Sequence, residues 1–180
     1  RYDETPEVLR QKAVRIPISA KYESWRAMLR GLAARFPEEQ FPGVDVQNLS
    51  YFLQDATAGS PSDRCFTGEL WLPVRSPREK HHELDFLISF VVPYYTIRRL
   101  CVVFPGYPTD TTETALERSF DLSPDELPFA KAIAEEIETT FPGHEPIPPE
   151  VGMTVIPNIQ AGNKWFGEAT IFTCLFSDAW

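Results

Sequence analysis

The 180-residue chain has few cysteines and no apolar run long enough to cross a membrane. A membrane helix needs about 20 predominantly apolar residues, but the most apolar stretch here, residues 83–104, is broken by acidic, proline and arginine residues. Its three cysteines, Cys65, Cys101 and Cys174, lie far apart among apolar neighbours and lack the closely spaced ligand pairs of a zinc site. We therefore predict buried free thiols in a reducing compartment, with no metal and no membrane contact.

The common motifs of catalysis and phosphate binding are also missing. The sequence contains no glycine-rich phosphate loop, no G-x-S-x-G nucleophile elbow, no paired C-x-x-C and no H-E-x-x-H. It also lacks the lysine and arginine clusters that neutralise phosphates in nucleic-acid binding. These absences predict no cofactor and no nucleic-acid ligand. An enzyme would have to assemble its site from scattered side chains.

The apolar stretch predicts two neighbouring strands at the centre of the fold. Apolar residues recur at every second position from Leu84 to Val92, while Asp85 and Ser89 interrupt the other side, which predicts one core-facing side. The run at residues 97–104 is apolar on both sides, as expected for a central strand covered on two faces.

Two pairs of aromatic residues stand where loops often present anchors for a partner. Pro93 cannot donate a hydrogen bond to a strand ladder, so we predict the hairpin turn between the two central strands at residues 93–96. Core packing explains the same residues, and the two interpretations stay open. The pairs are Tyr94 with Tyr95 at the hairpin tip, and Trp165 with Phe166 after a polar loop.

The remaining patterns complete an α+β fold. Apolar residues at helical spacing predict a first amphipathic helix over residues 19–36, and a capping box at Ser123 and Glu126 begins a second that ends before Pro142. Further strands are predicted over residues 13–18, 49–53, 65–74, 151–156 and 167–176. We predict a single globular domain, residues 1–180: a mainly antiparallel sheet of about six strands, packed against two amphipathic helices, with its other face partly wet.

Negative charge is concentrated in one part of the chain. Residues 110–150 hold eleven acidic residues against two basic ones, which accounts for the whole net charge of −9. A strongly negative surface suits a basic protein partner, although a solvated helical face explains clustered glutamates equally well. We assign a partner-binding role to the acidic residues Asp110, Glu113, Glu117, Glu135, Glu136 and Glu138.

Two alternative functions stay open at this point. His81, His82 and Asp85 lie close together at the start of a central strand, where a small hydrolase could find a general base. A solvated strand entrance explains them too. The second alternative is an adaptor or assembly subunit that pairs through a strand edge near Pro17 or Trp180.

The whole pattern resembles one class of bacterial proteins. A compact acidic α+β chain with a strand meander, a glutamate-rich helix and the C-terminal segment GEATIFTCLFSDAW is similar to immunity proteins of polymorphic toxin and type VI secretion systems. This resemblance assigns no individual residue. It implies a non-enzymatic inhibitor that covers the active site of a cognate, basic toxin. The expected location is the cytoplasm, or the periplasm if a signal sequence preceded Arg1.

Overall fold

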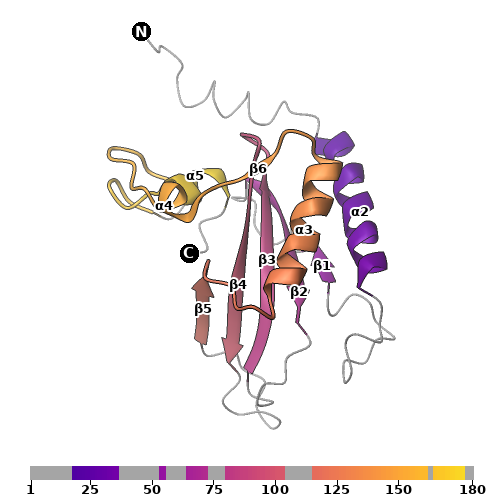
Figure 1. Cartoon of the computed structure of the whole chain (residues 1–180). Coiled ribbons are helices and arrows are strands. Elements are labelled where there is room, and N and C mark those ends of the chain that lie inside the picture. Colours follow the sequence, from indigo (N-terminus) through magenta and orange to yellow (C-terminus); the bar gives the residue numbers. More distant parts are fainter. Residues whose placement is uncertain are drawn as a thin grey trace.

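The computed structural model of this chain describes residues 18–36, 53–55, 64–72, 80–103, 115–161 and 164–176. Its centre is an antiparallel sheet whose strands lie in chain order: β1 (Leu53–Asp55), β2 (Cys65–Trp71), β3 (Lys80–Ser89), β4 (Tyr94–Val103) and β5 (Ala115–Ser119). A short strand, β6 (Glu145–Pro146), pairs with β4 in parallel. The helices are α2 (Ile18–Arg35), α3 (Leu127–Thr140), α4 (Pro149–Gly152) and α5 (Ile171–Leu175). The predicted α+β class is confirmed, with α2 and α3 on one face of the sheet (Figure 1).

The face of the sheet toward α2 and α3 holds the main apolar core. Trp25 of α2 stacks on Phe66 of β2 with the ring centroids 5.1 Å apart, and its ring also contacts Phe86 of β3. Gly68 stands opposite Phe86 in the β2–β3 register, and a Cβ atom at Gly68 would overlap both Phe86 and Trp25. A glycine in the strand therefore makes the room that these two large rings occupy.

The second amphipathic helix follows its predicted stripe. Ala130, Ile133 and Ile137 are buried against the sheet. The predicted start of this helix at Ser123 is wrong, because residues 124–126 form a turn and α3 begins at Leu127 with Glu126 as its N-cap. The backbone N–H of Ser123 does donate to Oε2 of Glu126 at 2.6 Å, across this turn. None of the described helices is long and apolar enough to cross a membrane.

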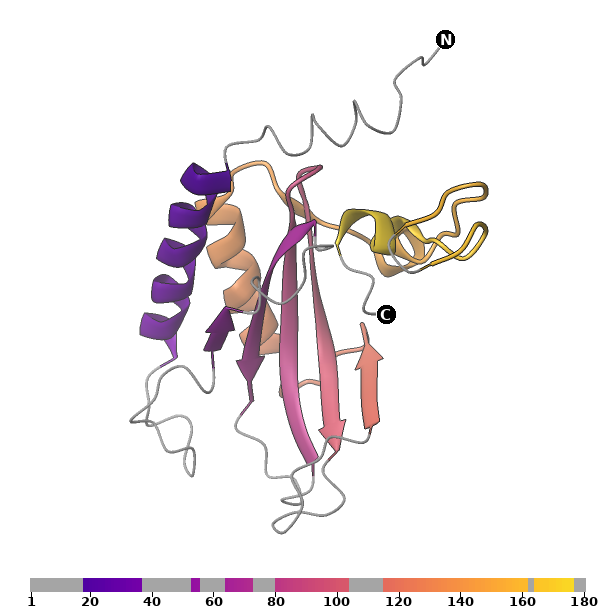
Figure 2. The same ribbon diagram turned by 180° about the vertical axis from the view of Figure 1, so that it is seen from behind.

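The opposite face of the sheet is more deeply buried than predicted. In Figure 2, which views the sheet from the side opposite α2 and α3, α5 lies near the end that carries the β3–β4 turn. Leu87 packs there in one cluster with Phe172 of α5 and with Phe176, the residue that follows this helix. Asp85 and Ser89, which alternate with Leu87 along β3, are only 4% and 2% exposed. The prediction of a partly wet second face is wrong in this region.

The predicted strand over residues 167–176 is also wrong, because its second half is the helix α5. Thr170 and Thr173 form a reciprocal cap, in which the backbone N–H of each residue donates to the hydroxyl oxygen of the other. Phe172 and Phe176 lie four residues apart, with ring centroids 5.1 Å from each other. Residues four apart share a side in a strand and in a helix, so this pair does not distinguish the two.

The turn between β3 and β4 lies at residues 90–93 rather than at 93–96. Two backbone N–H groups of the turn donate to the hydroxyl oxygen of Ser89, at 3.1 and 3.4 Å, so the turn begins directly after this residue. Tyr94 and Tyr95 are therefore the first residues of β4. Their predicted position at the hairpin tip is wrong.

The remaining predicted strands have different outcomes. The strand predicted at residues 151–156 is wrong, because α4 runs to Gly152 with Pro149 at its first position and only Val155 forms an isolated bridge. The strand at residues 13–18 lies outside the described residues, except that Ile18 begins α2. Of the strand at residues 49–53, only the last residue is described, in β1. Strand β5 was not predicted.

Candidate functional site

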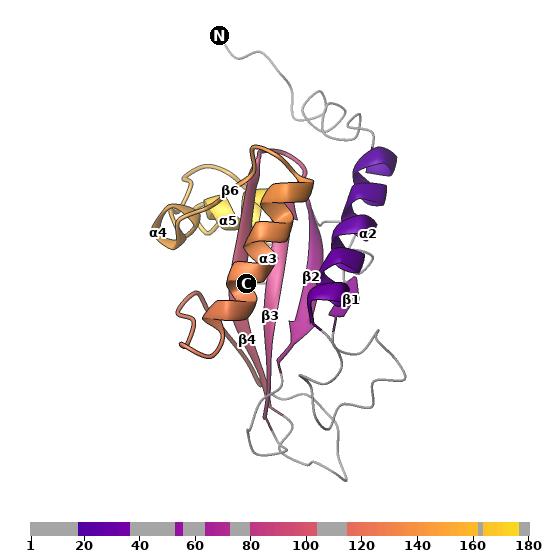
Figure 3. The same ribbon diagram turned by 45° about the vertical axis from the view of Figure 1, so that its right-hand side comes forward.

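Residues 149–161 and 164–170 project from the side of the sheet, and we call these residues the projecting loop (Figures 1 and 3). Its outgoing and returning arms are joined near the base. The backbone N–H of Ile156 donates to the carbonyl oxygen of Ala169 at 2.8 Å, and Val155 forms a bridge with Thr170. Asn158 has a positive φ of 61°, a conformation that asparagine tolerates better than most residues and that suits a turn.

The projecting loop carries most of the exposed apolar side chains of the described chain. Single exposed apolar residues are ordinary, whereas a group of them on one segment marks an interaction surface. Outside the loop, only Val91 and Leu127 among the described large apolar residues are comparably exposed. Trp165 is 69% exposed and Phe166 is 66% exposed, so both predicted anchors lie on the surface. The exposed apolar residues of the loop are Val151, Met153, Val155, Ile159, Trp165 and Phe166.

The loop is held in place at its base and beside its aromatic pair. Nε of Arg64 donates to the carbonyl oxygen of Cys174 at 3.1 Å. The backbone N–H of Arg64 donates to the carbonyl oxygen of Phe176 at 2.9 Å. These bonds tie α5 to the start of β2. Next to the aromatic pair, the N–H of Trp165 donates to Oε2 of Glu168 at 3.1 Å. A loop that is already ordered loses less conformational entropy when it binds.

Two of the predicted acidic residues are engaged within the molecule. Nη1 of Arg35, at the end of α2, lies 3.0 Å from Oε2 of Glu135, and its Nε lies 3.1 Å from Oε2 of Glu136. The side chain of Glu135 is 53% exposed, whereas that of Glu136 is only 16% exposed. These two glutamates therefore join α3 to α2, and their charges are partly neutralised by Arg35.

Glu138 is engaged with the sheet. The hydroxyl of Tyr95 donates to Oε1 of Glu138 at 2.7 Å, and Tyr95 as a whole is 2% exposed. Burial, followed by the bond to Glu138, raises the pKa of the Tyr95 hydroxyl above its usual range. Tyr95 is thus a core residue that places its hydroxyl at the surface of α3. Tyr94 is half-buried beside the α5 cluster.

The other predicted acidic residues are not gathered at one described site. Glu117 is exposed on β5, where it stands opposite Cys101 of β4 in the register. Asp110 and Glu113 lie outside the described residues. The predicted acidic residues that the structure describes lie on β5 and α3, whereas Trp165 and Phe166 lie on the projecting loop.

Two residues of the alternative hydrolase site, His82 and Asp85, do not come together. His82 pairs with Cys101 and Asp85 pairs with Arg98, so alternation along β3 puts His82 and Asp85 on opposite faces of the sheet. The side chain of His81 lies outside the described side chains. A general base at His82 cannot use Asp85 as its carboxylate.

Asp85 is instead half of a buried ion pair. Nε of Arg98 donates to Oδ2 of Asp85 at 3.0 Å, and the two side chains are 4% and 6% exposed, respectively. Burial raises the pKa of Asp85 although Arg98 opposes the change, and burial lowers the pKa of Arg98. The guanidinium also lies 5.2 Å from the ring centroid of Phe172. This pair belongs to the packing of α5 on the sheet.

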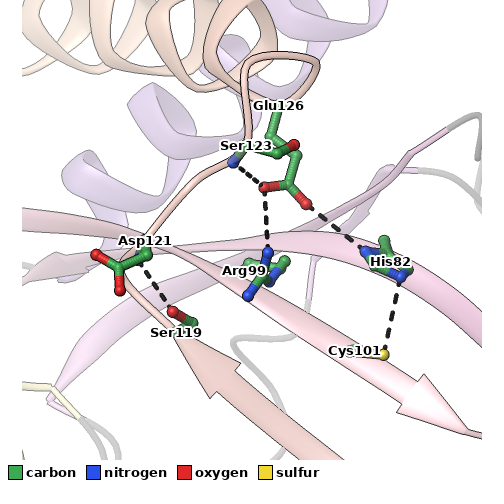
Figure 4. A network of polar contacts seen from close by, with 7 residues as sticks. All are labelled: His82, Arg99, Cys101, Ser119, Asp121, Ser123 and Glu126. Carbon is green, nitrogen blue, oxygen red and sulfur yellow. Dashed lines mark hydrogen bonds and ion pairs between the residues drawn. The ribbon is translucent and has the colours of Figure 1, made fainter.

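A different set of polar residues surrounds His82 on the helix face (Figure 4). Nδ1 of His82 lies 3.6 Å from Oε1 of Glu126, and its Nε2 lies 3.9 Å from Sγ of Cys101. Nη1 of Arg99 lies 3.8 Å from Oε2 of Glu126. The sequence indicated Glu126 only as a helix cap, and it gave no sign of Cys101. Glu126 and Cys101 lie next to His82 because of the β3–β4 register and because of where the turn before α3 crosses the strands.

An apolar groove of about 380 Å³ lies between α3, the start of β4 and the segment that leads to α4. Leu127 and Ala130 of α3 line one side, and Pro149 of α4 lines another. Lys131 is the only charged residue in the lining. The groove thus borders the base of the projecting loop, since Pro149 belongs to both.

Within the described ranges, no group of three or more histidine, cysteine, aspartate or glutamate side chains is placed to hold a metal ion. No family model matches this chain, and no curated protein and no solved structure matches it. The functional interpretation therefore rests on the geometry of the chain itself.

Proposed function

We propose that this protein is a non-enzymatic binding protein that uses the projecting loop to contact a protein partner. The observation that carries the proposal is the adjacent pair Trp165 and Phe166, exposed at 69% and 66% on a loop anchored in the core. Tryptophan is enriched among the residues that dominate binding energy, and large aromatic side chains bury much apolar area at an interface. Burying one large apolar side chain contributes roughly 1.5–3 kcal/mol.

The chemistry of the loop defines the partner. Trp165 and Phe166 suit an apolar pocket. The chain as a whole carries a net charge of −9, and Glu150 and Glu168 lie in the loop itself. A pocket with a basic rim would complement these charges. The electric field of the negatively charged chain would then raise the rate of association with such a partner. The same negative charge opposes contact with an anionic lipid surface.

The resemblance to immunity proteins supports a specific form of this proposal. The partner is then a cognate bacterial toxin, and the loop covers its active site. The acidic residues of α3 act through the field around the molecule, because Glu135 and Glu138 already have partners within the chain. Apolar contact by the loop supplies most of the affinity, and charge supplies most of the rate of association.

A capture experiment with three forms of the protein tests this proposal. Wild type, the double variant Trp165→Ala/Phe166→Ala and the control Val91→Ala are immobilised and exposed to extract of the native source at low and high salt. Val91 is 48% exposed in the β3–β4 turn, so its variant truncates an apolar side chain outside the loop. We expect one stoichiometric protein with wild type and the control, and its loss with the double variant. Equal capture by all three forms would contradict a contact through the loop.

A further inference from the structure

Cys101, His82 and Glu126 form a thiol–imidazole–carboxylate series that the binding proposal does not use. The three side chains come from β4, from β3 and from the turn before α3. Sγ of Cys101 lies 3.9 Å from Nε2 of His82, and Nδ1 of the same ring lies 3.6 Å from Oε1 of Glu126 (Figure 4). The two ring nitrogens therefore face different groups, one the thiol and the other the carboxylate.

This order of groups favours the tautomer that activates a thiol. A carboxylate beside Nδ1 favours the ring form that carries its proton on that nitrogen, which leaves Nε2 as an acceptor toward the thiol. Transfer of the thiol proton to Nε2 then gives a thiolate beside an imidazolium ion. The thiolate is the nucleophilic form of cysteine, and the adjacent carboxylate stabilises the imidazolium.

The carboxylate is fixed rather than free to rotate. Oε2 of Glu126 accepts the backbone N–H of Ser123 at 2.6 Å and lies 3.8 Å from Nη1 of Arg99. The Glu126 side chain is 6% exposed. Its other oxygen, Oε1, is thereby held toward His82. The fold positions this group through a hydrogen bond within the turn that leads into α3.

The charged groups around the thiol come from four elements. His82 faces it from β3, Arg99 lies two residues away on β4, and Glu117 stands opposite it on β5. Glu126 faces the far side of the imidazole from the turn before α3. Glu117 is exposed, and the side chain of Arg99 is 25% exposed.

We propose that Cys101 is a nucleophilic thiol, activated by His82 with Glu126 as the positioning residue, and that it accepts an acyl group from a small ester or thioester. The sulfur attacks the carbonyl carbon, a sulfur–carbon bond forms, and the bond from that carbon to the leaving oxygen or sulfur breaks. The thiol proton passes to Nε2 of His82 and from there to the leaving group. The side chains of His82 and Arg99 are 26% and 25% exposed, whereas Cys101 is 7% exposed, so a reagent would approach the thiol from the side of these two residues.

The site is independent of the projecting loop. His82 and Cys101 pair near the end of the β3–β4 ladder that lies away from the turn, whereas α5 packs at the turn end. They also lie on the helix face of the sheet, and α5 covers the opposite face. Failure of the binding proposal would therefore leave this inference untouched, and the reverse also holds.

The other cysteines provide controls within the same molecule. Cys174 is more exposed than Cys101, so accessibility alone would make it the faster thiol. Cys65 is fully buried, and its Sγ lies 3.4 Å from the carbonyl oxygen of Phe176. The experiment measures acetylation of each cysteine by p-nitrophenyl acetate, by mass spectrometry of peptides from the folded full-length chain.

At neutral pH we expect Cys101 to be acetylated about tenfold faster than Cys174 or more, as general-base assistance allows. His82→Gln and Glu126→Gln should each slow the reaction at Cys101 by roughly tenfold or more. His144→Gln, which changes another half-buried histidine, should leave this rate unchanged. A Cys101 rate no higher than that of Cys174, or one insensitive to His82→Gln in a folded variant, would overturn the proposal.

A measurement on the wild-type protein alone keeps the test valid if a variant fails to fold. An ordinary thiol loses about 75-fold of its thiolate between pH 8 and pH 6. The rate at Cys101 should fall by less than about tenfold over this range, because an imidazole that takes the thiol proton during the attack does not require a preformed thiolate. A fall as steep as that of an ordinary thiol would overturn the proposal without any mutation.

Discussion

Removing either partner of the Asp85–Arg98 pair should cost far more stability than breaking an exposed ion pair. The Nε–Oδ2 distance is 3.0 Å, and both side chains are almost fully buried between β3, β4 and α5. Arg98→Met leaves an uncompensated carboxylate in the interior, and Asp85→Leu leaves an uncompensated guanidinium. Each single change should lower the free energy of unfolding by about 3–5 kcal/mol.

The double variant Asp85→Leu/Arg98→Met should be close to wild type in stability. It removes both buried charges and fills their space with apolar atoms, so the desolvation that raises the pKa of Asp85 and lowers that of Arg98 disappears as well. The free energies of unfolding come from urea denaturation followed by circular dichroism. Single changes that cost under about 1 kcal/mol, as surface pairs do, or a double variant as unstable as the sum of the singles, would refute this reasoning.

The buried carboxylate also gives a pH dependence with a defined sign. Because the pKa of Asp85 in the folded protein lies above its ordinary value of 3.8, the native state binds the proton more tightly than the unfolded state. Its contribution to stability is present below pH 3.8 and is lost as the pH rises through the folded-state pKa. Asp85→Leu should remove this part of the pH dependence.

Three further changes test other parts of the structure. Arg35→Ala should lower the free energy of unfolding by up to about 1 kcal/mol, because exposed pairs are screened, whereas the control Arg26→Ala should have less effect in the same urea titration. Gly68→Ala should cost about 1–3 kcal/mol through overlap with Phe86 and Trp25, and a change in thermal midpoint under 1 °C would contradict this packing. Burial lowers the pKa of His144, so stability should fall as the pH drops below 6.5, and His144→Gln should remove that fall.

The elements that sequence could predict are those with a single, uninterrupted period. α3 places Ala130, Ile133 and Ile137 at helical spacing, and no strand pattern fits those positions. In β3, Leu84, Phe86 and Ile88 alternate and are all buried on the helix face. In these segments, the spacing of the apolar residues in the sequence therefore matches the face that is buried in the structure.

The elements that sequence could not predict depend on side-chain bonds or on packing. α5 is rich in β-branched and aromatic residues, which favour strands, yet the mutual cap of Thr170 and Thr173 begins a helix there. The turn before β4 begins directly after Ser89, whose hydroxyl accepts two of its N–H groups, and it ends at Pro93 rather than beginning there. Local propensity is too weak to decide such cases.

The candidate sites show the same division. The exposure of Trp165 and Phe166 agrees with their predicted place in a loop after a polar segment. Sequence spacing could not predict that His82, Cys101 and Glu126 lie together. Their positions depend on the pairing register of β3 with β4 and on where the turn before α3 crosses these strands. Asp85 is near His82 in sequence, but strand alternation puts the two side chains on opposite faces of the sheet.

The most direct test of the binding account is a calorimetric titration of the captured partner with wild type, Trp165→Ala and Val91→Ala. An anchor residue at the centre of an interface contributes at least about 2 kcal/mol, or roughly a 30-fold change in Kd. The account predicts that Trp165→Ala weakens binding by that factor or more, while Val91→Ala stays within about twofold of wild type. Binding by Trp165→Ala within about twofold of wild type would contradict a contact through the projecting loop.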